Sequence, residues 1–177
     1  MYRPSGDQET KTIRVDSEIL RIINKDASKK NISDNALISQ ILQRYVISDR
    51  YLENFPIVVV IQDMINLFLE KTSHDEVKQI GYQIGSKTPR SIFLMKGIDE
   101  VNLETVVWYF ENNHENYARW FSLNHHISDD GDILHMRHSL GRKWSSFLSG
   151  YMRGFFQSLL GIKVDIEESD SYVTVRA

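Results

Sequence analysis

The sequence predicts an α+β protein built from two consecutive units. The first unit is predicted over residues 10–52, where a short segment of alternating polarity precedes two amphipathic helical patterns. The second is predicted over residues 55–177, where a helix followed by two strands occurs twice, at 102–138 and at 140–176. This arrangement favours an antiparallel sheet packed by helices. Asn54-Phe55-Pro56 separates the units, because the residue before a proline disfavours the helical region.

A half-buried strand is predicted over residues 10–15. Side chains alternate along a strand, so Ile13 and Val15 would face one side of it. The polar side would carry Thr10, Thr12 and Arg14. Residues 1–9, which precede the strand, hold no hydrophobic run, and we expect a flexible arm there and not a signal peptide.

Two helices are predicted directly after this strand. Asp16 or Ser17 can cap the first, and Asn31 suits the left-handed end of the turn that follows. Ser33 would cap the second, which continues towards Leu52. The apolar positions are Ile19, Ile22, Ile23 and Ala27 in the first helix and Leu37, Ile38, Ile41, Leu42 and Tyr45 in the second.

This first unit is too small to stand alone. One strand has no partner, and about 40 residues are too few to close a hydrophobic core. A twofold dimer solves both problems, because the two strands would pair antiparallel and four helices would share one core. The polar row of the strand would then occur twice on a two-stranded ribbon, which fits the DNA major groove.

The unit resembles the ribbon-helix-helix family of DNA-binding proteins (the Arc, MetJ and CopG type). The matching residues are the strand Lys11-Thr12-Ile13-Arg14-Val15, the helix start Ser17-Glu18-Ile19-Leu20 and the turn Asn31-Ile32-Ser33-Asp34-Asn35-Ala36. This chain has Asn31 where the family usually has a glycine in the inter-helix turn. The match covers roughly a fifth of the chain. The alternative is a strand and helical hairpin inside one larger α+β domain.

The resemblance implies roles for particular residues. Thr10, Thr12 and Arg14 would read base edges in double-stranded DNA. The backbone amides of Ser33, Asp34 and Asn35 would hold a phosphate, a role that a helix N-terminus also favours physically. Lys29 and Lys30 would contact phosphates from the turn before them.

Charge is distributed unevenly along the chain. The first fifty residues hold nine Lys or Arg against seven Asp or Glu, a balance of +2, whereas residues 51–177 hold twelve against seventeen, a balance of −5. This difference fits DNA contact confined to the first unit. The chain has no cysteine, which excludes disulfides and thiolate chemistry. No apolar run approaches the roughly 18 residues of a membrane-spanning helix, so we expect a cytoplasmic protein without a membrane partner.

The first half of the second unit gives a mixed pattern. Residues 55–61 contain Ile-Val-Val-Val-Ile, which predicts a strand buried on both faces. One helix is expected to end near Lys71 and the next to begin at Ser73. Residues 85–89 predict a loop, and residues 91–96 fit either a strand or a helix.

The second half is clearer. Asn102 would cap a helix, and a turn at 128–131 would join strands at 118–127 and 133–138. A long helix would follow, capped by Ser139 and ended by Gly161. The closing hairpin is predicted at 163–167 and 172–176.

Four histidines fall in the first of these hairpins: His125, His126, His135 and His138. Imidazoles bind zinc, nickel or copper, and nickel-responsive regulators join a ribbon-helix-helix module to a ligand-sensing domain. Their metal site uses a cysteine, which this chain lacks. Two of the histidines, three apart on one strand, would also face opposite sides. We therefore expect hydrogen-bonded or partly exposed histidines and no cofactor, with a metal ion as the alternative.

Three cations surround the start of the long helix: Arg137, Arg142 and Lys143. Positive charge opposes the helix dipole at this end, which would be rational if an anionic ligand or DNA backbone were bound there. The alternative that we favour is pairing with the acidic residues Asp129, Asp130 and Asp132.

The long helix also carries an aromatic row: Trp144, Phe147, Tyr151 and Phe155. We interpret this row as core or dimer interface, with an apolar ligand cavity as the alternative. Gly150 and Gly154 would let another element approach the helix closely. Gly81 and Gly85 lack the Lys-Ser/Thr of a phosphate-binding loop, and no nucleophile or metalloprotease motif occurs, so we expect no enzyme.

These patterns favour a homodimeric, sequence-specific DNA-binding transcriptional regulator, repressor-like, acting as a dimer or a dimer of dimers. The second unit would oligomerise and bind a small-molecule or anionic effector. One alternative is the antitoxin of a toxin–antitoxin pair. Another is a small-molecule-binding or metal-binding domain that the first unit only dimerises.

Overall fold

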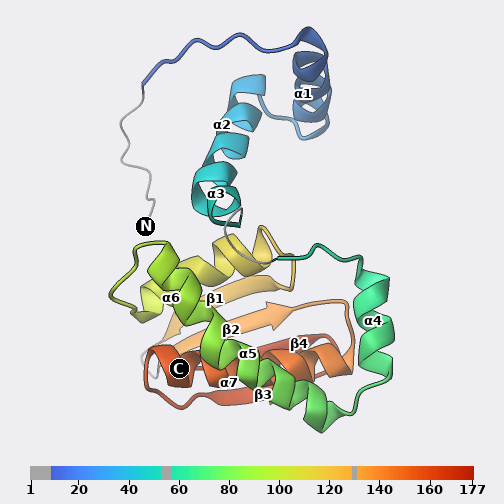
Figure 1. Ribbon diagram of the computed structural model, residues 1–177, viewed down its shortest axis with the longest axis vertical. Coiled ribbons are helices and arrows are strands. Elements are labelled where there is room, and N and C mark those ends of the chain that lie inside the picture. The colour runs from blue at the N-terminus through green and yellow to red at the C-terminus, as the bar shows by residue number, and fades with distance from the viewer. Residues whose placement is uncertain (1–8, 53–56, 129–130) are drawn as a thin grey trace. The chain divides into compact units, whose positions relative to one another are not determined.

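The protein has the predicted α+β class, with the helices and the antiparallel sheet drawn in Figure 1. The computed structural model describes residues 9–52, 57–128 and 131–177. The chain divides into two compact units, Met1–Pro56 and Ile57–Ala177, which are described one at a time.

The first unit holds the two predicted helices. They are α1 (Ser17–Lys29) and α2 (Asp34–Arg44), and helical conformation continues through a π-helical turn, η1 (Tyr45–Asp49), into α3 (Arg50–Leu52). The Asp16 carboxylate caps α1 by accepting the Glu18 amide at 2.8 Å. The Ser33 hydroxyl caps α2 by accepting the Ala36 amide at 3.2 Å. Both caps satisfy amides that lack a partner inside the helix.

The turn between α1 and α2 has the predicted left-handed residue. Asn31 has φ of 54°, and its amide donates to the Ser28 carbonyl at 3.2 Å. The next amide, that of Ile32, donates to the Ala27 carbonyl at 3.1 Å. These two bonds form a Schellman motif, in which Asn replaces the usual glycine.

Residues 9–15, which precede α1 and its cap, have no regular secondary structure in the single chain. No backbone hydrogen bond joins residues 9–15 to another described residue. A strand needs a neighbour to complete its ladder, and the sequence-based prediction places that neighbour in a second chain. The ribbon at residues 10–15 therefore stays a prediction.

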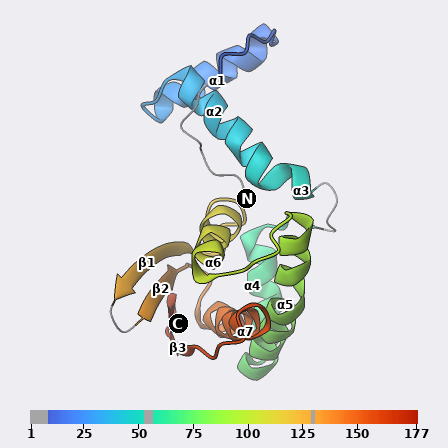
Figure 2. The ribbon, with the colours of Figure 1, turned by 90° about the vertical axis from the view of Figure 1, so that its left-hand side faces the viewer.

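The second unit confirms the repeated order of helix, strand and strand. Its elements are α4 (Gln62–Glu70), α5 (His74–Met95), α6 (Leu103–Tyr109), the π-helical η2 (Phe110–Glu115), β1 (Ser122–Ser128), β2 (Gly131–Arg137), α7 (Arg142–Leu159), β3 (Asp165–Glu168) and β4 (Tyr172–Arg176). The strands form one antiparallel sheet in the order β1-β2-β4-β3. Helix α7 packs on β3 and β4 and on α5, so it lies between the sheet and α5 (Figure 2).

The core of the second unit fills the space between the sheet and its helices. Alternate residues of β2 and β4 face this core, which explains the period of two in those strands. Its fully buried side chains include Leu134, Met136, Val173 and Val175 from the sheet and Leu148, Met152, Phe155 and Phe156 from α7. The aromatic row of the long helix is therefore core in this unit.

The strand predicted at residues 55–61 is wrong for the residues that the structure describes. Residues 57–61 have no regular secondary structure and are exposed, with Val58 at 81% and Val59 at 88%. Residues 55 and 56 lie outside the described residues. The continuous apolar run resembled a strand buried on both faces, but no strand among the described residues pairs with it.

The loop predicted at residues 85–89 is also wrong. Helix α5 continues through these residues and includes Pro89. Tertiary packing overrides the local signals, because Gly85 and Pro89 are both buried on the side of α5 that faces the core. The undecided residues 91–95 are helical as well.

Two predicted boundaries in the second half shift by a few residues. Strand β1 begins at Ser122 instead of residue 118, after Arg119 adopts a left-handed φ of 55°. Helix α7 begins at Arg142, not after Ser139; the residue before it is Gly141, with φ of 76° and no side chain to cap the helix. The turn residues 129 and 130 lie outside the described part of the chain.

Four glycines let α5 and α7 come into backbone contact. Gly81 and Gly85 of α5 lie against the carbonyls of Phe147 and Tyr151, and Gly150 and Gly154 of α7 lie against those of Lys78 and Tyr82. A Cβ atom at any of the four would approach a backbone oxygen closer than 3.0 Å. The predicted close approach at Gly150 and Gly154 is thus confirmed, and Gly81 and Gly85 supply the matching surface.

We predict that Gly85→Ala destabilises the protein by about 1–3 kcal/mol, the usual range for overpacking. The methyl group meets the Tyr151 backbone, which cannot rotate away, so the helices must separate despite the better helix propensity of alanine. Urea unfolding measures the loss. Ser91→Ala, at an exposed position of the same helix, serves as the control and should change stability by less than about 0.5 kcal/mol.

Candidate functional site

The three predicted base-reading residues are accessible in the first unit. Thr10, Thr12 and Arg14 are all exposed, on the segment that makes no backbone hydrogen bond to the rest of the described chain. No other described residue of their own chain hydrogen-bonds to the backbone groups that a paired ribbon would use.

The predicted phosphate-contacting residues meet at the turn between α1 and α2. The amides of Asp34 and Asn35 lie in the first turn of α2, where a helix has no internal acceptor for them. Ser33 is the cap of this helix, and Lys30 is exposed at the end of α1. Lys29 forms an exposed ion pair with Asp26 at 3.1 Å, which is weak enough to exchange for a phosphate.

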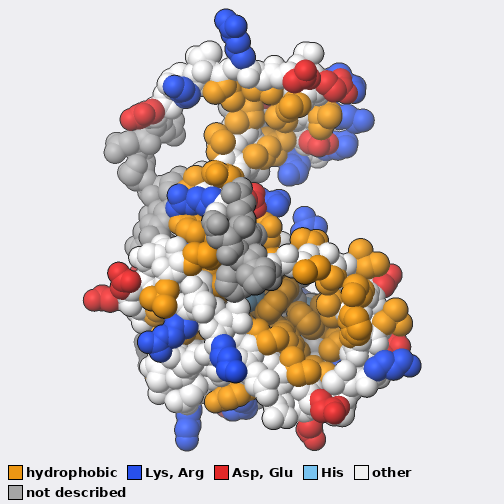
Figure 3. Space-filling view, in the orientation of Figure 1, with side chains coloured by type: hydrophobic (Ala, Val, Ile, Leu, Met, Phe, Trp, Pro, Cys, Tyr) orange, Lys and Arg blue, Asp and Glu red, His pale blue; other side chains and the backbone are white. Residues whose placement is uncertain are grey.

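The first unit exposes seven large apolar side chains. Among its described residues, only Ala27 and Leu37 are buried apolar residues. Those that are exposed are Ile13, Ile19, Leu20, Ile22, Ile41, Leu42 and Tyr45, at 38–61%. A groove of about 390 Å³ between α1 and α2 is lined by several apolar residues of the two helices, including Ile22 and Ile41. Figure 3 shows hydrophobic side chains gathered on this unit.

The four candidate metal histidines do not converge. The Nε2 atom of His125 lies 3.2 Å from the Asp132 carboxylate, and the Nδ1 atom of His135 lies 2.9 Å from the Thr174 hydroxyl. His126 is exposed on β1, and His138 contacts α7. No group of three or more His, Asp or Glu side chains among the described residues is placed to hold a metal ion.

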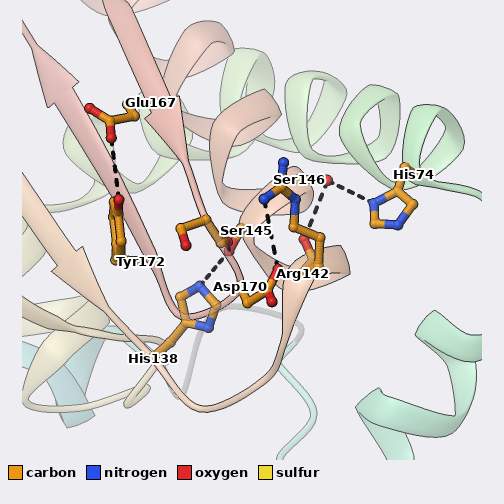
Figure 4. Close-up of polar contacts among 9 residues, drawn as sticks. His74, His138, Arg142, Ser145, Ser146, Glu167, Asp170 and Tyr172 are labelled. Carbon is orange, nitrogen blue, oxygen red and sulfur yellow. Dashed lines mark hydrogen bonds and ion pairs between the residues drawn. The ribbon is translucent and has the colours of Figure 1, made fainter.

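The three candidate anion-binding cations separate into different roles. The Lys143 ammonium donates to the carbonyls of Leu69 and Glu70, at 2.8 and 3.2 Å, and so caps the C-terminus of α4. Arg142 lies 3.7 Å from the Asp170 carboxylate, an exposed pair visible in Figure 4. The expected partners of these two cations were the acidic residues of the 129–132 turn. That expectation is wrong for Asp132, which pairs with His125, and Asp129 and Asp130 lie outside the described residues.

The third cation, Arg137, lines a cleft of about 320 Å³ at one end of the β1–β2 hairpin. Arg119 lines the same cleft. It lies three residues before Ser122, the β1 residue that pairs with Arg137 of β2. Neither guanidinium forms an ion pair with a described carboxylate. The remaining walls are apolar at Trp120 and Leu140 and polar at Gln62, Ser122, Ser139, Glu115 and His138.

His138 is held as a neutral imidazole at the edge of this cleft. Its Nδ1 atom accepts the Leu140 amide at 3.3 Å, so the proton lies on Nε2, which donates to the Ser145 hydroxyl at 2.9 Å. That hydroxyl donates in turn to the Ser169 carbonyl. Burial lowers the pKa of His138 and so favours the same neutral form. Figure 4 shows His138 directed from the end of β2 towards Ser145 on α7.

Behind Trp120 lies a second histidine, His114, in the aromatic core. It lies within the π-helical turn η2, and rings of Tyr109, Phe110, Trp120, Phe121 and Tyr151 surround it at centroid distances of 4.7–5.8 Å. Its Nε2 atom lies 2.9 Å from the Tyr151 hydroxyl. Burial lowers the pKa of His114 to about 3 and raises the pKa of Tyr151, so both groups stay neutral.

Sequence reasoning missed Arg119, Trp120 and His114. They lie in the segment between α6 and β1, where the sequence pattern predicts a strand from residue 118 but no functional site. The left-handed backbone at Arg119 is also invisible in the sequence, because arginine seldom adopts it. Only the fold shows that this segment joins the cleft to the core.

We predict that His114 makes the protein less stable in acid. Its folded pKa lies below the unfolded value of about 6.5, so its stabilising contribution is complete above pH 6.5 and falls as the pH drops towards 3. When the pH drops from 7.5 to 5, the free energy of unfolding of the wild type should fall by about 2 kcal/mol more than that of His114→Gln. Chemical unfolding at the two pH values measures this difference. The exposed control His126→Gln should behave as the wild type, and an unchanged slope in His114→Gln would contradict the assignment.

None of the described helices is both long enough and apolar enough to cross a membrane. No known protein family, curated protein or solved structure matches this chain.

Proposed function

We propose that this protein is a homodimeric, sequence-specific DNA-binding regulator of transcription. In this proposal the first unit binds double-stranded DNA, and the second unit oligomerises and binds an anionic effector. The observation that carries it is the exposed apolar surface of the first unit, together with the unpartnered, solvent-facing segment that precedes α1.

Dimerisation follows from the energetics of that surface. Seven large apolar side chains are 38–61% exposed on a unit in which the described residues include only two buried apolar ones. Covering a large apolar side chain contributes about 1.5–3 kcal/mol, so a second copy that covers this surface would supply the missing core. The groove between α1 and α2 gives the partner's apolar residues a place to pack.

DNA recognition follows from the same arrangement. Pairing residues 10–15 of two chains would satisfy their free backbone groups and display Thr10, Thr12 and Arg14 twice on one face. A two-stranded ribbon fits the major groove, where arginine reads guanine through two hydrogen bonds. The free amides of Asp34 and Asn35, with Lys30 beside them, suit a backbone phosphate.

The folded second unit favours a regulator over an antitoxin. Toxin-neutralising extensions are typically short and disordered until bound, whereas residues 57–177 form a sheet with its own buried core. Co-purification with a small toxin would reverse this preference.

We predict that Arg14→Ala weakens binding to the cognate operator by about 1–3 kcal/mol and relaxes specificity at one base pair. Footprinting on the upstream region of its own gene identifies the operator, and titration of that operator and of random DNA measures the loss. The control Arg21→Ala changes an exposed arginine that pairs with Glu18 on α1 and should bind like the wild type. An equal loss on random DNA would mean that Arg14 contacts only phosphate, and no footprint would reject the proposed function.

The cleft of the second unit is the favoured place for the effector. The guanidinium groups of Arg119 and Arg137, which have no described carboxylate partner, line this cleft. The cleft also has one glutamate, Glu115, and an apolar wall. Such a site suits a small carboxylate with an apolar body, because charge-assisted bonds fix the anion and Trp120 covers the remainder.

We predict that benzoate raises the melting temperature of the protein, whereas uncharged benzamide does not. Arg137→Gln and Arg119→Gln should each weaken benzoate binding by about tenfold or more, since each removes a charge-assisted hydrogen bond. Calorimetric titration measures the affinities. Arg90→Gln, an exposed change on α5 outside the cleft, is the matched control. If Arg137→Gln, Arg119→Gln and Arg90→Gln all bind benzoate with the same affinity, benzoate binds outside the cleft.

A further inference from the structure

Helix α4 of the second unit is apolar on both of its sides. Ile65 and Leu69 pack against the core of their own unit. Met64, Leu67 and Phe68 point away from that core and are 42%, 61% and 61% exposed. Gln62, Asp63, Asn66 and Glu70 interrupt the apolar residues of α4, but covering the three exposed apolar side chains would still be favourable.

The segment that leads into α4 has the same property in a stronger form. Residues 57–61 are five consecutive β-branched residues, exposed at 44%, 81%, 88%, 39% and 72% in chain order. Ile61, the residue that precedes α4, is extended, with φ of −74° and ψ of 151°. Within the described part of the chain, residues 57–60 form no backbone hydrogen bond. This composition has the highest strand propensity, and its unpaired backbone is ready to accept another strand.

Residues 57–61 and the outer side of α4 make one continuous surface, which we call the α4 face. Figure 3 shows hydrophobic side chains gathered over this part of the second unit. From the exposed fractions of its eight apolar residues, and at about 150 Å² for each fully exposed side chain, the face exposes roughly 700 Å². This is more than the 300–600 Å² of the largest patch on a typical monomer and close to the about 800 Å² that each partner buries in a standard interface.

We propose that the α4 face binds the α4 face of a second copy of this chain, with residues 57–61 of the two copies paired as antiparallel strands. The stretch from residue 54 to residue 62 holds no charged residue, so the paired segments of the two copies meet without charge repulsion. Antiparallel pairing about a twofold axis satisfies the free backbone groups of both copies at once. The choice of partner rests on the proposed function, because a dimer of the first unit would hold two copies of residue 57 on short tethers and raise their effective concentration.

The absence of cysteine from the chain allows a direct test in the full-length protein. Val59 is the middle residue of the segment, so in the proposed pair the two copies of residue 59 lie opposite each other, with Cβ atoms about 4.5–5.5 Å apart. Mild oxidation of Val59→Cys should therefore produce a disulfide-linked dimer on a non-reducing gel. The control Ile127→Cys, 74% exposed on β1, should cross-link only by slow collision.

A second substitution distinguishes binding through the α4 face from cross-linking that arises only because a dimer of the first unit holds the two copies close together. In the Val59→Cys background, Phe68→Lys should slow cross-linking by about tenfold, because it places a charge in the apolar centre of the face. Leu94→Lys, at a similar exposure of 62% on α5, should leave the rate unchanged. Val59→Cys that links no faster than Ile127→Cys, or a rate that Phe68→Lys does not change, overturns the proposal. Cross-linking of Val59→Cys no faster than that of Ile127→Cys is also the result expected if the first unit of the same chain covers the α4 face.

Operator binding by reduced Val59→Cys is measured in parallel and reports on the first unit alone. Failure to cross-link with intact, Arg14-dependent DNA binding refutes the α4 interface and leaves the proposed function standing. Efficient, Phe68-dependent cross-linking without specific DNA binding supports the interface and refutes the regulator.

Discussion

The backbone contact between α5 and α7 is the constraint on which the second unit depends. Four glycines, two on each helix, remove the side chains that would otherwise hold these helices apart. Interiors pack as densely as organic crystals, so a shift of this contact would be felt by everything that α7 touches. On its other side α7 carries Leu148, Met152 and Phe156 into the core beneath the sheet. The position of α7 also sets the Tyr151 hydroxyl beside His114 and the Lys143 ammonium on the last carbonyls of α4.

The two units solve the problem of burial in different ways. The second unit buries a large aromatic core and keeps His114 and Tyr151 within it neutral, as the low pKa of His114 and the raised pKa of Tyr151 indicate. The first unit completes its helix caps and its turn but buries only Ala27 and Leu37 as apolar residues among those described. Local hydrogen bonding can thus be finished within a short chain, while hydrophobic burial requires more surface than this unit has.

Features that depend on local chemistry were predictable from the sequence. Asp16, Ser33 and Asn102 cap helices as predicted, because a cap involves only neighbouring residues. The continuation of α5 through Pro89 was not predictable, since only its distant partner α7 shows that this side of the helix is buried. The candidate site divides in the same way. Arg137 was singled out from its position in sequence, whereas Arg119 and Trp120 join it only through the fold.

The two segments that were predicted as strands outside the sheet share one physical feature. Residues 10–15 and 57–61 both have strand-forming composition, and neither makes a backbone ladder with another described residue of this chain. Helices complete their hydrogen bonds within one segment, but a strand needs a partner that any chain can supply. The composition of these segments therefore reports a requirement for pairing without reporting where the partner lies. A second copy of the chain is the one partner guaranteed to carry a matching segment at both positions, which is why both proposals lead to the same twofold assembly.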